Sequence, residues 1–528
     1  MDFVWLLLQL ILDTSASWVR MFIALGLSLI ISIAVGVYAA TSRTAEKILI
    51  PIVDILQTVP ILAFFPVVIF VFVFLLPGYI GINAAVIFLI VTSMVWNIIL
   101  GVYESVKTIP KEFMEVAELY HFDGWSKLRR IYFPAAFPRI VEQSILSWSI
   151  GLFYLVTSEI FSIGNTNYQV KYGIGTALIS LASQGSAAYI LGIAVFIVFV
   201  VATRFLFFKP LEDYSTKHMR QKEASGRMHY EKEFLDWIGK KLPRNRAVFD
   251  SEGFSVAAQK KHAYFEPISH ITRIARPKID ISRFYAPLAL LILVVVALIF
   301  ASNGSLAGQE AIILQALAAS FARVWLAFLA ILVISIPLSV YIIFMTNRSS
   351  EYLLLFQVMA SIPATILLPA IAVGFSKYPG HGELVAFVIF FLSGIWYIIF
   401  SIIASTRTLP SNVFEVQKIF GVKGKNAWRN IYIKAILPGL VTGAMTGIAA
   451  EWNASIVAEY FTTTGISGST VISSVSVGMG KLLDTSLASG GGGLAIMGLA
   501  LLNLVVMILI INTFLWKRFY KKLAGVYS

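Results

Sequence analysis

The sequence contains no cysteine and little charge: only 13% of its 528 residues are Asp, Glu, Lys or Arg. The missing cysteines exclude a secreted fold held together by disulfides. Soluble proteins carry about 25% charged residues, so this chain cannot cover itself with polar surface. Apolar residues make up 58% and the mean hydropathy is +0.83. Lipid is therefore expected to be most of its solvent, which excludes most classes of soluble enzyme.

Eleven segments are long and apolar enough to cross a bilayer, which takes about 20 residues of helix. In the first half they are Trp18–Ala40, Ile48–Leu76, Ile82–Tyr103, Ile140–Ile163 and Ala187–Phe208. In the second half they are Ala286–Ala301, Ala318–Met345, Leu353–Ser376, Leu384–Ala404, Leu440–Phe461 and Leu494–Trp516. Three prolines predict a kink or break in the second segment. Met1–Leu12 is too short to span and predicts an interfacial helix.

The distribution of positive charge gives the orientation. With the N-terminus outside, 36 of the 41 Lys and Arg residues fall on the cytoplasmic side, as the positive-inside rule requires. The C-terminus is then cytoplasmic, and the chain is expected in the inner membrane. The net charge of +13 is thus mainly a signal of topology, and nucleic acid is not an expected partner.

The two halves repeat each other. Ser93–Phe161 aligns with Ser393–Phe461 without a gap, and 18 of the 69 positions are identical. Shared Leu or Ile is expected between any two spans, but shared Trp, Pro, Gly and Glu are not. Examples are Trp96/Trp396, Pro110/Pro410, Glu115/Glu415, Gly124/Gly424, Pro138/Pro438 and Glu159/Glu459. The extra span at Ala286–Ala301 gives both copies the same orientation, which favours parallel over inverted repeats.

This repeat predicts four parts in an all-α integral membrane protein. Residues 1–208 and 306–528 form two five-helix membrane domains, and residues 284–305 form one extra connecting helix. Residues 209–283 form a basic cytoplasmic linker that holds four of the six histidines, without the close spacing of metal ligands. We therefore expect no metal site there.

A polar loop between spans three and four occurs in both halves, at residues 107–138 and 407–438. Each copy has a proline, two amphipathic stretches separated by a turn, and a closing proline. Neither stretch can cross a membrane, but each could present a short helix to a cytoplasmic partner. An interfacial helix that only anchors the spans is the alternative.

These loops resemble the coupling motif of membrane subunits of binding-protein-dependent ABC importers, Glu-Ala-Ala-x3-Gly-x9-Ile-x-Leu-Pro. The corresponding residues are Glu115, Val116, Ala117 and His121 in the first loop, and Glu415, Val416 and Gly421 in the second. His121 departs from the motif, which has Gly at this position. Glu159 followed by Gly173-Ile-Gly175, and Glu459 followed by Gly478-Met-Gly480, resemble nitrate, sulfonate and taurine permeases.

The resemblance implies a type I importer fold, with both permease domains of one pore fused in a single chain. It implies two cytoplasmic ATPase subunits docked on the two loops and an extracytoplasmic solute-binding protein. ATP and Mg would be bound by the ATPases, because this chain has no GxxxxGK[ST] phosphate loop. No cofactor and no enzymatic activity are expected in the chain itself, and the cargo implied is a small anion such as nitrate or a sulfonate. A secondary transporter with parallel repeats and an ion channel are the alternatives.

Four residues are candidates for the translocation pathway or its outer gate: Glu159, Glu459, Trp452 and Asn453. The two glutamates could instead end their helices by pairing with a backbone amide or a basic residue. Arg20 and Arg323 begin spans at the outer edge, where a basic side chain is typical of an interfacial anchor.

Overall fold

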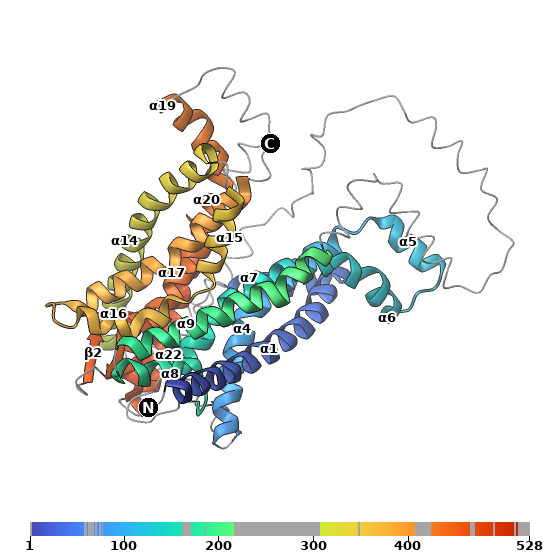
Figure 1. Ribbon diagram of the computed structural model, residues 1–528. Coiled ribbons are helices and arrows are strands. Elements are labelled where there is room, and N and C mark those ends of the chain that lie inside the picture. The colour runs from blue at the N-terminus through green and yellow to red at the C-terminus, as the bar shows by residue number, and fades with distance from the viewer. Residues whose placement is uncertain are drawn as a thin grey trace. The chain divides into compact units, whose positions relative to one another are not determined.

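The computed structural model is built mainly from long helices (Figure 1). It describes residues 3–57, 78–160, 170–215, 307–406, 424–464 and 470–511, apart from 185, 347–348 and 489–490. A few isolated positions between 61 and 76, and residues 514–515, are also described. Three predicted parts lie wholly or partly outside these residues: the extra span at Ala286–Ala301, the linker from 216 onwards, and residues 407–423 of the second polar loop. The two polar loops, 107–138 and 407–438, are called the first and second coupling loops below, after the motif that they resemble.

The first half contains ten described helices or helical turns. The first nine are α1 (Phe3–Thr41), α2 (Arg43–Leu56), α4 (Tyr79–Lys107), α5 (Lys111–Leu119), α6 (Gly124–Lys127), the π-helical turn η2 (Leu128–Tyr132), α7 (Phe133–Ile160), α8 (Ile174–Gln184) and α9 (Ser186–Thr203). A second π-helical turn, η3 (Arg204–Phe208), extends α9.

The second half follows the same order. It contains α14 (Ala307–Met345), α15 (Ser349–Ala360), the 3-10 turn η6 (Ala364–Leu367), α16 (Leu368–Phe375), α17 (His381–Thr406), α19 (Gly424–Ala427), the π-helical turn η7 (Trp428–Tyr432), α20 (Ile433–Ala458), α21 (Met479–Ala488) and α22 (Gly491–Ile511). A short antiparallel hairpin, β1 (Tyr460–Thr464) and β2 (Thr470–Ser474), follows α20. The prediction of an all-α membrane protein is confirmed, with this hairpin as its one described β element.

The predicted duplication is visible in the order and lengths of the helices. The first helix of each half, α1 or α14, has 39 residues. The five-residue π turns η2 and η7 lie 300 positions apart, at the offset of the sequence repeat. A π turn is rare and costs regular hydrogen bonds, so its recurrence at this position indicates a feature kept from a common ancestor of the two halves.

Seven described helices are long and apolar enough to cross a membrane, and each coincides with a predicted span. The span predicted over Leu353–Ser376 is wrong as a single helix, because it breaks between α15 and η6. Pro363 lies at this break with φ −66° and ψ 133°, and a proline disfavours helical geometry in the residue before it. Within Ile48–Leu76, where the three prolines predict a kink or break, Pro51 lies inside α2 and the helix ends at Leu56.

The N-terminal segment also differs from expectation. Met1–Leu12 was expected as a separate interfacial helix, but α1 continues unbroken from Phe3 to Thr41. No proline or glycine interrupts it before Gly26, and the Thr14 hydroxyl donates to the Leu10 carbonyl oxygen at 2.6 Å. Leu10 is 1% exposed, so this end of the helix packs against the protein.

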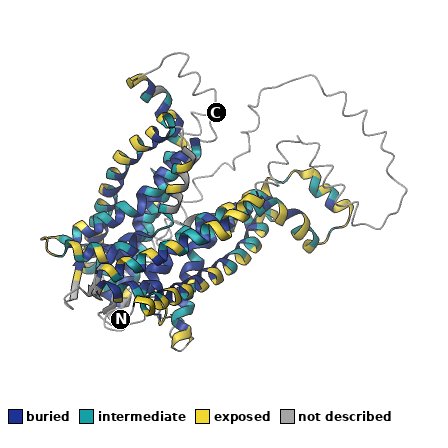
Figure 2. Cartoon of the chain, viewed as in Figure 1, coloured by how far each residue is buried: buried dark blue, intermediate teal, exposed yellow. Residues whose placement is uncertain are grey.

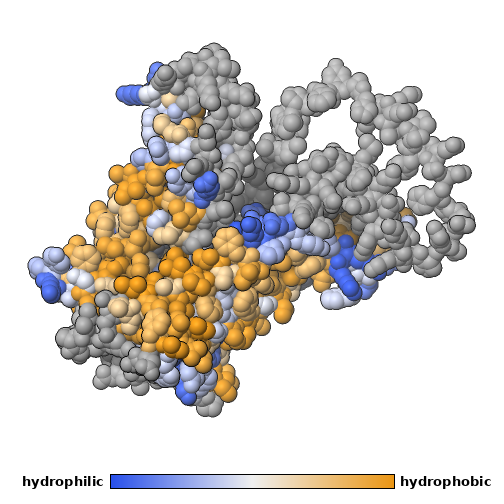
Figure 3. Space-filling view, viewed as in Figure 1, coloured by the Kyte–Doolittle hydropathy of each residue, from blue (hydrophilic) through white to orange (hydrophobic). Residues whose placement is uncertain are grey.

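Buried side chains line the contacts between helices, whereas exposed side chains lie on the outer faces of α1, α9 and α14 (Figure 2). Many of these exposed residues are large and apolar, including Leu8, Ile30, Ile190, Leu326 and Val333. Figure 3 shows the same property as an orange surface over the described helices. An outer surface of this kind is expected of a protein whose solvent is hydrocarbon, since water would make it costly.

Candidate functional site

The first coupling loop contains the short helix α5, which begins after Pro110. Ala117 is fully buried on its inner side, whereas Glu115 and Glu118 are exposed and Val116 is partly exposed. Leu119, at the end of the helix, is 75% exposed. The helix therefore presents acidic and apolar side chains on one accessible face, which is what a protein-docking helix requires.

The turn after α5 explains the departure from the motif at His121. This residue has φ 51° and is the only described non-glycine residue with positive φ. The left-handed conformation costs an ordinary L residue about 1–2 kcal/mol, which is why Gly suits this position. The amide of Phe122 donates to the Ala117 carbonyl oxygen at 2.8 Å, a bond that closes the helix end.

Asp123 then begins the second stretch of the loop. Its carboxylate accepts a hydrogen bond from the amide of Ser126 at 3.1 Å and caps α6. The bonds from the side chain and backbone of Ser126 lower the pKa of Asp123. From α6 the helix runs through η2 into α7 without a break, so the loop is joined directly to a span.

The second coupling loop, with Glu415, Val416 and Gly421, lies outside the described residues. Its C-terminal end resumes at α19 and η7, which join α20 as α6 and η2 join α7. The coupling roles of all seven motif residues stay predictions.

At the other end of α7, Glu159 forms a buried ion pair with Arg20 of α1. Their side chains are 0% and 5% exposed, and Arg20 Nη1 lies 2.7 Å from Glu159 Oε1. Ser17 donates to the same carboxylate at 2.7 Å, and the amide of Gly175 donates to it at 2.9 Å. Arg20 also donates to Asn83 Oδ1 at 2.7 Å. The network ties α1, α4, α7 and α8 together.

The second half repeats this network around Arg323 and Glu459. Arg323 Nη1 lies 3.2 Å from Glu459 Oε1, and the amide of Gly480 donates to Glu459 at 2.8 Å. The one change is at the position of Asn83, where the second half has Glu383, and this carboxylate forms two hydrogen bonds with Arg323. Glu383 also accepts from the amide and hydroxyl of Ser476.

The Gly-x-Gly motifs after these glutamates have a steric reason. A Cβ added to Gly173 would lie 2.7 Å from the Glu159 carboxylate, and one added to Gly478 would lie 2.4 Å from that of Glu459. Real Cβ atoms essentially never approach so closely, so only glycine fits. The motif thus belongs to the ion-pair network.

The expectation that Arg20 and Arg323 are interfacial anchors is wrong. Arg20 is 4% exposed and both arginines pair with buried carboxylates. A buried charge needs a partner because desolvation is costly, and here each glutamate supplies it. Of the two interpretations of Glu159 and Glu459, these contacts match pairing with a basic residue and a backbone amide. Their part in an outer gate stays a prediction.

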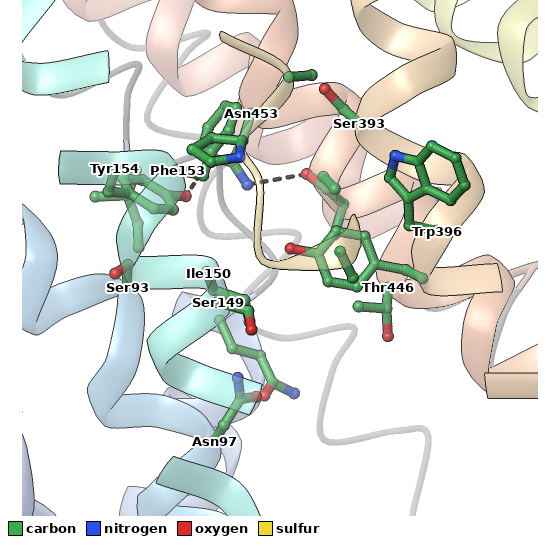
Figure 4. Close-up of a pocket in the computed structure, with 18 of the residues that line it drawn as sticks. Ser93, Asn97, Ser149, Ile150, Phe153, Tyr154, Ser393, Trp396, Thr446 and Asn453 are labelled. Carbon is green, nitrogen blue, oxygen red and sulfur yellow. Dashed lines mark hydrogen bonds between the residues drawn. The ribbon is translucent and has the colours of Figure 1, made fainter. Parts of the chain in front are cut away.

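A cavity of about 230 Å³ lies between the two halves (Figure 4). It is lined by residues from α4 and α7 of the first half and from α17 and α20 of the second, together with the break before η6. Tyr154 donates to Asn453 Oδ1 at 2.5 Å across it, and the hydroxyls of Ser149 and Ser361 lie 2.8 Å apart. The cavity is therefore a site that neither half could form alone.

Equivalent positions of the repeat face this cavity in pairs. They are Ser93/Ser393, Trp96/Trp396, Asn97/Tyr397, Ser149/Ala449, Ile150/Ala450 and Phe153/Asn453. Asn453 was predicted to line the pathway, and it does line this cavity. Trp452 does not: it is 3% exposed and packs in the core. Glu159 and Glu459 are not among the lining residues.

The described lining is uncharged and combines apolar with neutral polar side chains. Two tryptophans, two tyrosines and a phenylalanine line it together with serine, threonine, asparagine and glutamine, and ten further residues are Ala, Ile, Leu, Met or Pro. A solute in this cavity would meet hydroxyl, amide and indole groups. Such groups can donate to an oxyanion or accept from a polar solute without binding it as tightly as a charge would.

The sequences of the two halves match one known family twice. Residues 32–208 and 349–520 each match the family described as binding-protein-dependent transport system inner membrane component. The two matches together cover more than half of the 528 residues. The chain belongs to this family. Its predicted resemblance to importer permeases, and the duplication of the membrane domain, are thereby confirmed.

Curated relatives of this family member differ in their cargo. The chain is 26% identical over 152 residues to the bicarbonate transport system permease protein CmpB of Synechococcus elongatus, covering 29% of this chain and 52% of CmpB. It is 27% identical over 146 residues to the nitrate import permease protein NrtB of Synechocystis sp., covering 27% and 50%. It is 23% identical over 180 residues to the glycine betaine/carnitine transport permease protein GbuB of Listeria monocytogenes, covering 34% and 58%. The chain spans about half the length of these relatives.

Of the residues that line the cavity, only Asn453 is predicted from the sequence. Trp96/Trp396 and Ser93/Ser393 are identical pairs within the gap-free repeat, and this identity was the available signal. A tryptophan in a span is more often a packing residue. What the sequence could not give was the face of each helix that meets the other half.

Proposed function

We propose that this chain is the complete membrane-spanning part of an ABC importer and that its cargo crosses through the cavity between the halves. The observation that carries this proposal is the cavity itself, which is built from equivalent positions of two fused permease domains. Two such domains surround one pathway, so a second copy of the chain is not needed.

Transport would be driven from the cytoplasmic side. Two ATPase subunits, which bind ATP and Mg, would dock on the loops at 107–138 and 407–438, with Glu115 on the exposed face of α5 as a contact. Closure of the ATPases on ATP would move the two loops and shift the spans between inward-open and outward-open arrangements, because each arrangement binds the ATPase dimer differently. An extracytoplasmic binding protein would deliver the cargo.

The proposed complex holds one copy of this chain and two ATPase subunits. Mass measurement of the purified complex tests this composition, and two copies of this chain per complex would contradict it. ATP-independent uptake driven by an ion gradient would favour the alternative of a secondary transporter.

The proposed orientation has the N-terminus outside and both loops inside. The chain has no cysteine, so a single introduced cysteine reports its own position. In the variant Tyr120→Cys, whose site is 41% exposed, an impermeant reagent added outside intact cells should label nothing. Labelling from the outside would contradict the proposed orientation.

Two cargo classes are consistent with the lining. A small oxyanion such as nitrate, bicarbonate or a sulfonate is favoured by the neutral donors of Trp96, Trp396 and Asn97. A zwitterion with a quaternary ammonium group is favoured by the aromatic rings, since such rings attract cations. We favour the oxyanion. Uptake of nitrate, bicarbonate, taurine and glycine betaine into vesicles with the complete transporter separates the classes, and selective uptake of glycine betaine would exclude our choice.

A further inference from the structure

The contact between α17 and α20 depends on a row of small residues. Gly439, Gly443 and Gly447 of α20 are spaced by four and share one side of the helix. A Cβ added to Gly443 would lie 2.9 Å from the Cα of Ile398, and one added to Gly439 would lie 2.5 Å from the Ser401 carbonyl oxygen. Glycines let helix backbones approach this closely in a membrane.

Glu451 is the next residue in this row, four positions after Gly447. Its carboxyl lies over Gly394 of α17: a Cβ added there would be 2.5 Å from Glu451 Oε1 and 2.8 Å from Ile331 Cδ1. Glu451 is 0% exposed. Neither of its oxygens has a hydrogen-bond partner among the residues that the structure describes.

The first half shows that this carboxyl replaces an apolar group. At the equivalent positions it has Gly151 and Met94, and a Cβ added to Gly151 would lie 2.2 Å from the Met94 Cε. The large and small residues have exchanged helices between the halves. Packing alone therefore does not require an acid at position 451.

No described ionisable group of the neighbouring helices is bonded to Glu451. Arg323 of α14 pairs with Glu383 of α17 and with Glu459. Glu310 is bonded to Asn503, and His381 and Lys481 are each bonded to two carbonyl oxygens. The remaining ionisable groups are Tyr341 of α14, which is 56% exposed, Tyr397 in the cavity lining, Lys434 in the first turn of α20, and Asp484 of α21. Among the described residues none forms an ion pair or hydrogen bond with Glu451.

An unpaired carboxylate inside a membrane protein is expensive, whereas a protonated carboxyl is much less so. The wall of the cavity is also close in the chain: Ser393 and Ala450, the neighbours of Gly394 and Glu451, both line it. We propose that Glu451 is a proton-binding site, protonated while α17 and α20 are closed and able to exchange its proton with cavity water when they separate.

The exchange is a simple acid–base step. A proton from cavity water binds a carboxylate oxygen, an O–H bond forms, and no electrons are transferred. Because only the protonated form tolerates the closed contact, proton binding favours closure of the second half and proton loss favours its opening. The first half has no acid at this position, so the switch acts on one half of the pathway.

The proton can be observed directly by infrared spectroscopy of the complete transporter in lipid. Wild type and Glu451→Gln, which keeps the size of the side chain, are compared from about pH 6 to about pH 8. We expect the variant to lose one protonated-carboxyl C=O band that shifts in D2O. Glu351→Gln, at an exposed position in the first turn of α15, is the matched control and should leave that band unchanged. Loss of an ionised band in Glu451→Gln would overturn the proposal.

A second variant guards against misfolding. The double change Glu451→Gly with Gly394→Met transplants the packing of the first half, and it should lose the same band. Retention of the protonated band in both variants would also overturn the proposal.

Proton exchange during transport is tested by ATP-driven uptake. The ratio of wild-type to Glu451→Gln uptake should change at least about threefold over this pH interval, since only the wild type can titrate at the site. A constant ratio would overturn the exchange. The infrared result does not depend on cargo or on uptake, so absence of ATP-driven uptake in both proteins would count against the proposed function alone.

Discussion

The two halves share one scaffold but differ in where they place acids and small residues. In the first half α4 packs against α7, and the small residue Gly101 of α4 faces Gln143 of α7. In the second half α17 packs against α20, and the glycines at the contact lie on α20, the equivalent of α7. The second half also has acids at positions where the first has none, for example Glu383 for Asn83, Glu451 for Gly151 and Asp484 for Ile179. Symmetry is kept in the Arg20–Glu159 and Arg323–Glu459 ion pairs and in the π turns, and it is lost at these acidic positions. A fused chain allows this difference, because each half can change independently.

The largest effect is expected at the ion pair that both halves keep. Arg20→Met should lower the free energy of unfolding by about 3–5 kcal/mol, because it leaves the buried Glu159 carboxylate without its cation. Denaturant unfolding in detergent measures this. The double change Arg20→Met with Glu159→Gln should recover at least half of the loss, and no recovery would show that Arg20 acts mainly through packing.

The same network offers a variant that makes the halves more alike. Glu383→Asn gives the second half the residue of the first. Because the Glu383 side chain is 41% exposed, its pair with Arg323 should contribute about 1 kcal/mol or less. If Glu383→Asn lowered the free energy of unfolding as much as Arg20→Met, the Arg323–Glu383 pair would contribute to stability as a buried ion pair does.

The coupling loops should be unequal. Glu115→Ala and Glu415→Ala should each weaken ATPase docking by about 1.5–3 kcal/mol, roughly ten- to hundredfold, with the larger effect at Glu415. His121 holds a left-handed turn where the second loop has Gly421, so we expect the first loop to fit a different ATPase surface. Stimulation of ATP hydrolysis by loaded binding protein is the measurement. Full stimulation in both variants would remove these glutamates from coupling.

The seam between α17 and α20 should be intolerant of a single methyl group. Gly439→Ala would place Cβ 2.5 Å from a backbone oxygen, and such overpacking should cost about 1–3 kcal/mol. Gly308→Ala, where nothing lies within 4 Å, is the matched control and should change stability by less than about 0.5 kcal/mol. Equal stability of the two variants in thermal unfolding would show that the α17–α20 contact can accommodate an added methyl group.

The smallest expected effect is a pH dependence in the second half only. Burial raises the pKa of Asp484 from 3.8 to about 6, so its contribution to stability is present below pH 3.8 and is lost as pH rises through about 6. A shift of this size is worth at most about 3 kcal/mol, and solvent screening of the partly exposed carboxyl reduces it. We therefore expect wild type to lose about 1 kcal/mol between pH 4 and pH 7 relative to Asp484→Ile. This variant copies the first half, and parallel stability curves for the two proteins would exclude the effect.

Most of the fold could be predicted from sequence because its signals are local or repeated. Apolar length gives the spans, and identical Pro, Gly and Trp residues give the duplication. Helix ends were less predictable: α1 begins at Phe3, 15 residues before the predicted start of its span at Trp18, and ends at Thr41. Nothing in the apolar count distinguishes a helix that ends at the membrane surface from one that continues.

The site was less predictable because its contacts join distant residues. Arg20 and Glu159 are 139 positions apart, and each alone has the pattern of a charged residue at the end of a span. The carboxyl of Glu451 is a similar case, since its burial depends on its contact with Gly394 on another helix. The cavity pairs could be found in part, through the identity of Trp96 and Trp396.

The continuity of α6, η2 and α7 has a mechanical consequence. Together they form one helical rod of 36 residues, from Gly124 to Glu159, about 54 Å long at 1.5 Å per residue. If one end is held by the pair with Arg20, a tilt of about 5° moves the other end by about 5 Å. The side chain of Tyr154 sits only five residues from the held end, so the same tilt moves it by less than about 1 Å. A displacement of several ångströms at the loop would thus produce only a small displacement of Tyr154 at the cavity.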